Sequence, residues 1–267
     1  MQEQLWQHVA AVRAQSPLVQ NITNFVVMNN SANALLAVGA SPIMAHAHPE
    51  IRQMLAICQA LVVNIGTLDE YWAEAMLLAA IEARRLGRPW VLDPVGAGAT
   101  SYRNELLDKL LAYRPTLIRG NASEILALAR LASGPTKGVD STAASQEAAA
   151  AARQLSEELE AVVCVSGETD LIVPGPRQVE IANGSPLMTK VTGLGCSATA
   201  VLGAFAAVAA PDALFEAAVA GVALFSVAGE LAAEGATGPG SLQVRLLDTL
   251  YGITAADFGG RLRLRVC

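Results

Sequence analysis

Short, almost continuously apolar segments alternate with longer segments of helical periodicity over the first two thirds of the chain. The apolar segments contain β-branched residues and show little alternation of apolar with polar positions. This pattern is typical of strands that are buried on both faces of a parallel sheet. It predicts an α/β fold of three layers, in which a mostly parallel central sheet lies between helices on both faces.

The periodicity also predicts where the elements lie. We expect strands at residues 18–21, 41–44, 60–65, 89–95, 116–119 and 161–166. The expected helices are residues 28–38, 49–58, 69–86, 104–113, 123–131 and 145–160. Two further short segments, residues 171–173 and 178–182, flank a Pro-Gly-Pro turn and predict a hairpin at the edge of the sheet. The last third of the chain is expected to be wholly helical.

Nothing in the 267 residues resembles a linker between two cores, so we expect one domain over residues 1–267. Apolar residues make up 53% of the chain and charged residues 16%, which is unusually hydrophobic for a soluble monomer. Residues 196–210 are too few for a membrane span, which needs about 20 apolar residues. The next apolar run carries Glu216 and Glu230, which a membrane would accept only at high cost. We therefore expect no membrane partner and attribute the high content of apolar residues to packing between subunits.

The composition also restricts the compartment and the partners. The first residues lack the basic start and apolar core of a secretory signal, so we expect a cytoplasmic protein. The four cysteines are few and widely spaced, which argues against a disulfide framework and against a zinc site. A net charge of -6 argues against nucleic acid as a partner.

Polar side chains follow the predicted strands at the point where each strand ends. Open parallel sheets bind ligands beyond the carboxyl ends of their strands, so we expect these side chains to share a site. They are Asn24, Asn64, Asp93, Arg119 and Ser166.

Residues 193–196, Gly-Leu-Gly-Cys, precede an alanine-rich run that predicts a helix. Uncovered backbone N–H groups and the helix dipole make such a start a site for phosphate or another anion. We predict an anion hole formed by Gly193, Gly195 and Cys196. The alternative for Cys196 is a small apolar filler between two glycines.

Asp93 ends an otherwise apolar strand, and Glu124 starts a helix just after Arg119. Near phosphates, two such carboxylates would hold magnesium directly or through water. The alternatives are a turn-forming Asp before proline and a capping box of Asn121 with Glu124. Arg119 ends a buried strand and needs an anion, which Glu124 or a nucleotide phosphate would supply. The hydroxyl of Ser166 either contacts a phosphate or belongs to a plain turn.

Two motif searches narrow the class of enzyme. Residues 193–198 match G-x-G-x-x-A, but this dinucleotide fingerprint belongs in a first βα unit, not near the end of a chain. No G-x-x-x-x-G-K-[ST] sequence is present, which excludes a P-loop enzyme. His46 and His48 lie on a loop without a third ligand at helical spacing, so we do not predict a metal site there.

Five segments together make the chain resemble the hydroxyethylthiazole kinases, a ribokinase-like family of thiamine biosynthesis and salvage. The resemblance runs nearly end to end, and its most specific parts are residues 21–27, 39–44, 93–98, 119–121 and 191–196. It implies a ribokinase-like fold and ATP-dependent phosphorylation of the hydroxyl of 4-methyl-5-(2-hydroxyethyl)thiazole. It also implies a homotrimer with active sites at subunit interfaces.

The resemblance assigns roles by position. Met44 and Gly193 resemble the thiazole-binding residues, with Asn24 nearby, and Arg119 and Ser166 resemble the ATP-binding residues. Asp93 and Glu124 fall where the family places its magnesium-associated acids, so Mg²⁺ is the implied cofactor.

Cys196 stands where related sugar and vitamin kinases carry Asp. A helix N-terminus lowers the pKa of a thiol, so we expect Cys196 to accept the proton of the substrate hydroxyl. Positioning and charge stabilisation dominate phosphoryl transfer, however, so a strong base is not required.

Two other functions compete with this interpretation. One is a ribokinase-like kinase of another small alcohol, such as a hydroxymethylpyrimidine. The other belongs to a different class and is an NAD-binding oxidoreductase built on the G-x-G-x-x-A match.

Overall fold

The computed structural model describes residues 2–133 and 144–267, and the strands of this part of the chain form one sheet in the order β2-β1-β3-β4-β5-β6-β7-β8-β9. Strands β1 to β6 pair in parallel, whereas β7, β8 and β9 pair antiparallel. The strands are β1 (Leu18–Ile22), β2 (Ser41–Ile43), β3 (Ala60–Asn64), β4 (Trp90–Asp93), β5 (Leu117–Asn121), β6 (Val162–Ser166), β7 (Asp170–Val173), β8 (Val179–Ile181) and β9 (Leu264–Val266).

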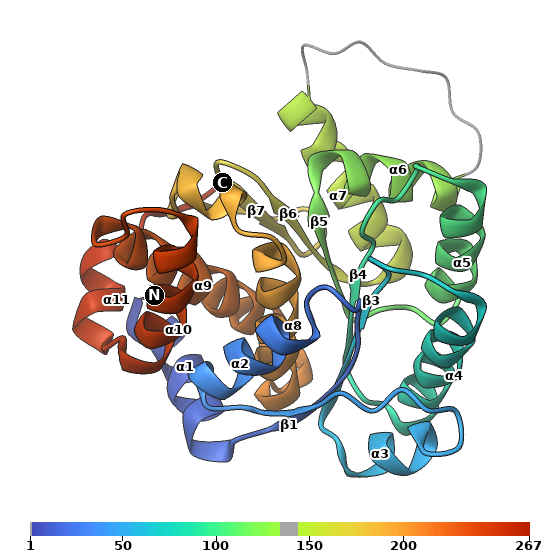
Figure 1. Cartoon of the computed structure of the whole chain (residues 1–267). Coiled ribbons are helices and arrows are strands. Elements are labelled where there is room, and N and C mark those ends of the chain that lie inside the picture. The colour runs from blue at the N-terminus through green and yellow to red at the C-terminus, as the bar shows by residue number, and fades with distance from the viewer. Residues whose placement is uncertain (1, 134–143) are drawn as a thin grey trace.

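Helices cover both faces of this sheet, as Figure 1 shows. One layer holds α1 (Gln2–Gln15), α2 (Met28–Val38), α8 (Leu194–Val208), α9 (Leu214–Glu234), α10 (Pro239–Gly252) and α11 (Ala255–Arg261). The other holds α3 (Ile51–Ile57), α4 (Glu70–Leu86), α5 (Ser101–Leu111), α6 (Ala122–Ser133) and α7 (Ala144–Leu159). Two 3-10 turns, Pro186–Lys190 and Pro211–Ala213, precede α8 and α9. The expected three-layer α/β architecture is confirmed.

The central strands alternate between two apolar cores. Every residue of β3 is buried, with Val62 in the core shared with α8 and with Leu61 and Val63 in the core shared with α4. Helix α9, together with the 3-10 turn before it, is long and apolar enough to cross a membrane by composition alone. Because 72% of its most apolar window is buried inside the fold, the composition of α9 is that of a core helix.

Two sequence predictions are wrong at the ends of the chain. The last third is not wholly helical, because β9 returns to the sheet and pairs antiparallel with β8. As a result β9, not the β7–β8 hairpin, forms the edge. Arg265 of β9 forms a cross-strand ion pair with Glu180 of β8 at 2.5 Å, and the alternation of apolar and basic residues over 262–266 is a strand signal that was missed. Helix α1 was not expected either, although Leu5, Val9 and Val12 make a buried stripe at helical spacing.

The strand order reverses between β1 and β3. The chain leaves β1 for β2 on one side and then crosses back to β3 on the other side. Connections that diverge in this way open a ligand crevice at the carboxyl ends of the two strands, the topological switch point of the sheet. Asn24 follows β1 and Asn64 ends β3, so the polar strand ends flank this crevice.

Candidate active site

Three side chains at the switch point form a continuous hydrogen-bonded chain. Asn24 Nδ2 donates to Asn64 Oδ1 at 2.7 Å, and Asn64 Nδ2 donates to Asp93 Oδ2 at 2.7 Å. Asn64 and Asp93 are neighbours in the parallel register of β3 and β4, which places their side chains next to each other. All three residues are buried. The ends of β1, β3 and β4 are therefore joined by side chains as well as by the sheet.

Asn24 reaches this position because Gly66 has no side chain. A Cβ at Gly66 would lie 2.4 Å from Asn24 Nδ2 and 2.7 Å from its Cγ. The backbone N–H of Gly66 donates to Asn64 Oδ1 at 3.0 Å. Gly66 therefore both admits the Asn24 amide and fixes the Asn64 amide.

Helix α8 begins at the same end of the sheet, beside the carboxyl ends of the parallel strands. Its N-cap, Gly193, has φ 79°, a left-handed conformation that glycine adopts without strain. Its first intrahelical hydrogen bond runs from Ser197 N to Gly193 O. The N–H groups of residues 194–196 precede that bond and lie in the turn where helices bind anions.

The pKa of the Cys196 thiol is shifted in the direction opposite to the expected one. This pKa is raised to about 11, first by burial and then by the charge of Asp93, whereas the amides of Asn64 and Asn24 and the charge of Arg119 act to lower it. Asn24 Nδ2 lies 3.6 Å from the sulfur. The expectation that the helix N-terminus lowers this pKa is therefore wrong, because burial and a neighbouring carboxylate outweigh the dipole. At neutral pH the thiol carries its proton.

Arg119 extends from β5 to the first turn of α8. Its Nη1 donates to Gly195 O at 3.0 Å. In the described residues the guanidinium forms no ion pair within 4.0 Å, although its charge lowers the pKa of both Asp93 and Asp170. Of the two anions considered for Arg119, Glu124 therefore forms no direct ion pair with it, and the nucleotide phosphate stays a prediction. The positive charge faces the helix start without a paired carboxylate.

Asp93 and Glu124 bring two carboxylates to the carboxyl-terminal end of the parallel strands. Burial raises the pKa of Asp93 to about 6, and the charge of Glu124 adds to the rise, whereas Arg119, Thr199 and Asn64 lower it. Glu124 is held by two backbone N–H groups, Gly96 N to Oε1 at 3.0 Å and Asn121 N to Oε2 at 2.8 Å.

The capping box predicted for Asn121 and Glu124 is present. Glu124 N donates back to Asn121 Oδ1 at 3.0 Å, so the two residues cap the start of α6 reciprocally. This cap fixes the Glu124 carboxylate without removing its charge from the site.

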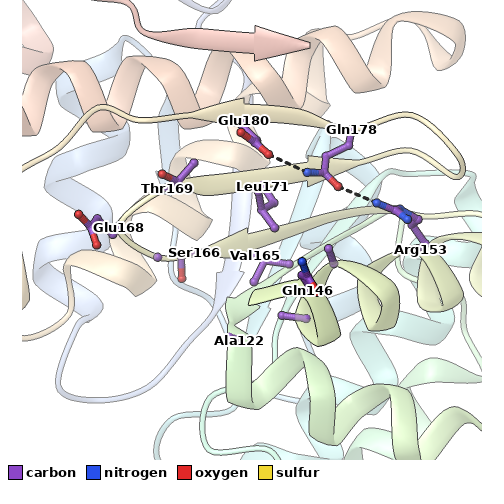
Figure 2. Close-up of a pocket in the computed structure, with 13 residues that line it drawn as sticks. Ala122, Gln146, Arg153, Val165, Ser166, Glu168, Thr169, Leu171, Gln178 and Glu180 are labelled. Carbon is purple, nitrogen blue, oxygen red and sulfur yellow. Dashed lines mark hydrogen bonds between the residues drawn. The ribbon is translucent and has the colours of Figure 1, made fainter. Parts of the chain in front are cut away.

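Ser166 ends β6 at the rim of a cavity of about 680 Å³. Its hydroxyl donates to Gly120 O at 3.3 Å. Figure 2 shows the cavity between α7 and the β6–β8 strands, with Ser166 and Glu168 toward one end and the hydrogen-bonded pair Gln178 and Arg153 toward the other. The cavity is long enough to hold a group much larger than a phosphate.

Met44 follows β2, one strand away from Asn24. In the described chain no hydrogen bond joins Met44 to Asn24 or Gly193. An aromatic row lies nearby, in which Trp72 contacts His46 at 3.9 Å and Phe25 at 4.6 Å between ring centroids. The structure thus places Met44 after the strand next to β1 and does not bring its side chain into the hydrogen-bonded chain.

Both loop histidines pack against aromatic rings, in a described part of the chain where no group of three or more potential metal ligands occurs. His48 stacks on Tyr71 with 3.9 Å between ring centroids and an interplanar angle of 5°. The His-x-His pair therefore has an aromatic packing role.

Sequence reasoning gave no role to three further residues of the site. Asn64 was named only as a polar strand end, although it joins two other site residues. Thr199 lies three residues after Cys196, on the same helix face; its hydroxyl donates to Gly195 O at 3.1 Å and lowers the pKa of Asp93. Arg103 of α5 donates to Val95 O at 2.8 Å and Gly66 O at 2.7 Å, so it holds the loops after β3 and β4 together. Helical spacing was a usable signal for Thr199, but nothing in the sequence marks Arg103.

Comparisons with known proteins agree with this geometry. The profile of the hydroxyethylthiazole kinase family matches residues 9–256. A hydroxyethylthiazole kinase of Syntrophus aciditrophicus (strain SB) is 54% identical over 263 residues, which cover 98% of this chain and 97% of that relative. The chain belongs to the hydroxyethylthiazole kinase family. The solved structure of the hydroxyethylthiazole kinase protein from Pyrococcus horikoshii OT3 matches it with a TM-score of 0.91 at 40% identity, covering 98% of both chains.

Membership of the hydroxyethylthiazole kinase family confirms the resemblance stated from the sequence. A ribokinase-like superfamily protein from Enterococcus faecalis V583 shares the fold, with a TM-score of 0.67 at 13% identity and 94% coverage of both chains. The ribokinase-like fold is therefore confirmed. The matches favour neither a hydroxymethylpyrimidine kinase nor an NAD-binding oxidoreductase.

Proposed function

We propose that this chain phosphorylates the hydroxyl of 4-methyl-5-(2-hydroxyethyl)thiazole with ATP, in thiamine biosynthesis or salvage. The observation that carries the proposal is the junction of Asn24, Asp93 and the start of α8 at one sheet edge. It occurs in a chain that shares 54% of its residues with the Syntrophus enzyme over almost its whole length. An alcohol at the crevice would face both the anion-binding helix start and two carboxylates.

The thiazole end of the site is assigned to the β1–β3 crevice. Asn24 supplies amide groups there, and Gly193 lets Val27 pack closely at the start of α8, because a Cβ at Gly193 would lie 2.4 Å from Val27 Cγ1. After β2, Met44 contributes an apolar, polarisable side chain, which suits a sulfur heterocycle. This assignment is supported by the burial of Asn24 and the aromatic row beside it.

The ATP end is assigned to Arg119, Ser166 and the cavity. The guanidinium of Arg119 lies at the first turn of α8, where free N–H groups of Gly195 and Cys196 complete an anion hole for the transferred phosphoryl group. Ser166 lies at the rim of the 680 Å³ cavity, which has room for the nucleoside. The phosphate chain of ATP would then run from the cavity toward Asn24.

Asp93 and Glu124 fit a magnesium ion that enters with ATP. Magnesium keeps several waters and binds through one or two carboxylates plus substrate phosphates, and two carboxylates are what this edge offers. The buried, raised-pKa carboxyl of Asp93 would gain from a nearby cation. When bound, Mg²⁺ neutralises charge on the phosphate oxygens. Glu124 is fixed for this task by its two backbone hydrogen bonds.

Cys196 is proposed to contact the reacting hydroxyl as a protonated thiol. A pKa of about 11 disfavours the thiolate that a general base requires. The proposed catalytic role of Cys196 is therefore to orient the hydroxyl beside the anion hole, in a reaction dominated by positioning and charge stabilisation.

We further propose a cytoplasmic homotrimer whose active sites lie at subunit interfaces. Phe25 and Val26, the two residues after Asn24, are 54% and 60% exposed. Large apolar side chains this exposed beside a ligand crevice support burial by a second subunit. Sedimentation equilibrium tests the trimer, with a mass three times 27.7 kDa as the expected result.

Ligand-dependent thermal shifts test the proposed function against its alternatives. Binding to the native state raises the melting temperature, so Mg-ATP and the thiazole alcohol should each stabilise the protein. A larger shift with a hydroxymethylpyrimidine than with the thiazole alcohol would favour the other small-alcohol kinase. Stabilisation by NAD alone would overturn the proposal.

A further inference from the structure

Asn64 occupies the centre of the site without a role in the function proposed above. It is 1% exposed and ends β3, between the strands that carry Asn24 and Asp93. Its carboxamide makes three hydrogen bonds, to Asn24 at 2.7 Å, to Gly66 N at 3.0 Å and to Asp93 at 2.7 Å. A buried amide at a strand end with all these partners is not needed for packing, since an apolar residue would fill the space at lower cost.

The partners of Asn64 permit one orientation of its amide. The backbone N–H of Gly66 can only donate, so it must face Asn64 Oδ1. The carboxylate of Asp93 accepts, so it must face Asn64 Nδ2. A flipped Asn64 would set oxygen against oxygen at Asp93 and N–H against N–H at Gly66.

The orientation of Asn64 determines that of Asn24. Because Asn64 Oδ1 is an acceptor, Asn24 must present Nδ2 to it. Asn24 Oδ1 accepts from Val26 N at 3.1 Å, which agrees with the same orientation. The second N–H of Asn24 then donates to the sulfur of Cys196, 3.6 Å from Nδ2, a weak acceptor that an alcohol oxygen would replace. The donor and acceptor roles along the hydrogen bonds from Asp93 through Asn64 to Asn24 are therefore all fixed by the Asp93 carboxylate and the Gly66 N–H.

We infer that Asn64 is a positioning residue, which holds the amide of Asn24 so that an N–H rather than a carbonyl oxygen faces the substrate alcohol. The inference rests on the proposed function, since it needs an alcohol bound beside Asn24. Without Asn64, the Asn24 carboxamide loses its 2.7 Å partner, and only the bond from Val26 N and the sulfur contact hold its orientation, so its N–H is less firmly directed at the alcohol.

The test is a double-mutant cycle on binding of the alcohol. Asn64→Ser and Asn24→Ala are made singly and together, and the dissociation constant of the thiazole alcohol is measured by calorimetry without ATP or magnesium. Each single variant should weaken binding by about tenfold, the effect of one buried hydrogen bond. Because Asn64 acts through Asn24, the double variant should bind no more than about threefold more weakly than Asn24→Ala.

Asn21→Ser is the matched control. Asn21 is also a buried asparagine of the same sheet, at 1% exposure, but its amide donates only to Val19 O at 3.1 Å. The Asn21→Ser protein should bind the alcohol with the dissociation constant of the wild type. If Asn64→Ser does not fold, Asn64→Thr carries the same prediction with a residue that suits a strand.

The outcomes separate this inference from the proposed function. Wild-type and Asn21→Ser proteins that bind and phosphorylate the alcohol establish the function independently. Given that, an unchanged dissociation constant in Asn64→Ser, or a double variant whose loss is the product of the two single losses, would overturn the positioning role alone. A wild type that does not bind the alcohol would overturn both.

Discussion

The guanidinium of Arg119 donates a 3.0 Å hydrogen bond to the carbonyl oxygen of Gly195, so the end of β5 is tied to the first turn of α8. A fixed cation at a helix N-terminus combines two features that attract phosphate, a full positive charge and unpaired backbone N–H groups. This contact makes Arg119 the residue that most directly links the sheet to the anion hole.

Arg119→Ala is therefore expected to weaken the binding of ATP more than the binding of the thiazole alcohol. A hydrogen bond to a charged group contributes roughly 1.5–3 kcal/mol, so the KM for ATP should rise by at least about tenfold. The affinity for the alcohol should stay within about threefold of wild type. Steady-state kinetics with each substrate varied in turn measures both.

Arg114→Ala is the control for Arg119→Ala. Arg114 forms a surface ion pair with Glu160 at 3.1 Å, far from the anion hole in the fold, so its loss should change neither KM. An unchanged nucleotide affinity in Arg119→Ala would remove Arg119 from the ATP site.

Cys196 should react slowly with alkylating reagents at neutral pH. Only the thiolate reacts, and a pKa of about 11 means that the rate should keep rising with pH through 7 to 10 without reaching a plateau. The pH dependence of iodoacetamide labelling, followed by mass spectrometry of the Cys196 peptide, measures this. A plateau below pH 8 would show a thiolate and restore a general base.

Substitution of Cys196 tests its role in the reaction. If the thiol only orients the hydroxyl, Cys196→Ala should keep the single-turnover rate within about tenfold, since one neutral hydrogen bond is lost. Cys196→Asp should retain activity, because a carboxylate at this helix start can also contact the hydroxyl. A rate equal to wild type in Cys196→Ala would leave the thiol without a catalytic role.

Asp93 should make the protein less stable as the pH rises. Its folded pKa of about 6 exceeds the ordinary 3.8, so between these values the folded state keeps a proton that the unfolded state loses. Stability therefore falls as the pH rises through this window, by at most about 3 kcal/mol at 1.36 kcal/mol per pKa unit. Asp93→Asn should consequently be more stable than wild type at pH 7.5 and of similar stability at pH 4.

Urea unfolding with EDTA present, at pH 4 and pH 7.5, measures this difference. Asp248→Asn, on the exposed side of α10, controls for loss of a carboxylate elsewhere. If Asp93→Asn is less stable than wild type at pH 7.5, burial is not the dominant influence on this carboxyl.

Gly66→Ala should damage the alcohol site specifically. The added Cβ would lie 2.4 Å from Asn24 Nδ2, so Asn24 must leave its place and alcohol affinity should fall by about tenfold or more. Gly240→Ala is the matched control, because a Cβ there meets no atom within 4 Å. Calorimetry with the alcohol should separate the two variants, and equal affinities would show that Asn24 does not bind the substrate.

The sequence predicted the strand ends well because their signal is local. An apolar strand followed by Asn24 or Asp93 is visible in a window of a few residues, and parallel strands bring such ends to one edge. Strand β9 was missed although residues 262–266, Leu-Arg-Leu-Arg-Val, alternate apolar and basic positions as a half-buried strand does. The ion pair with Glu180, 85 positions away in the chain, is what places it.

The chemistry of the site depended on contacts that no local pattern contains. The helix start predicted a lowered pKa for Cys196, but the larger influences are burial and the charge of Asp93, which arrive from other elements. Asn64 was visible as a strand end, whereas its three hydrogen bonds depend on the register of β3 with β4 and on the turn at Gly66. Residue types were therefore predictable from the sequence, and their electrostatic state was not.

The most direct test of the account is an assay of purified protein with Mg-ATP and 4-methyl-5-(2-hydroxyethyl)thiazole, in which the phosphate ester and ADP are both quantified by mass spectrometry. The account predicts ester and ADP in equal amounts, dependent on magnesium and on the alcohol. ADP without ester, or no turnover of the thiazole alcohol while a hydroxymethylpyrimidine is phosphorylated, would contradict it.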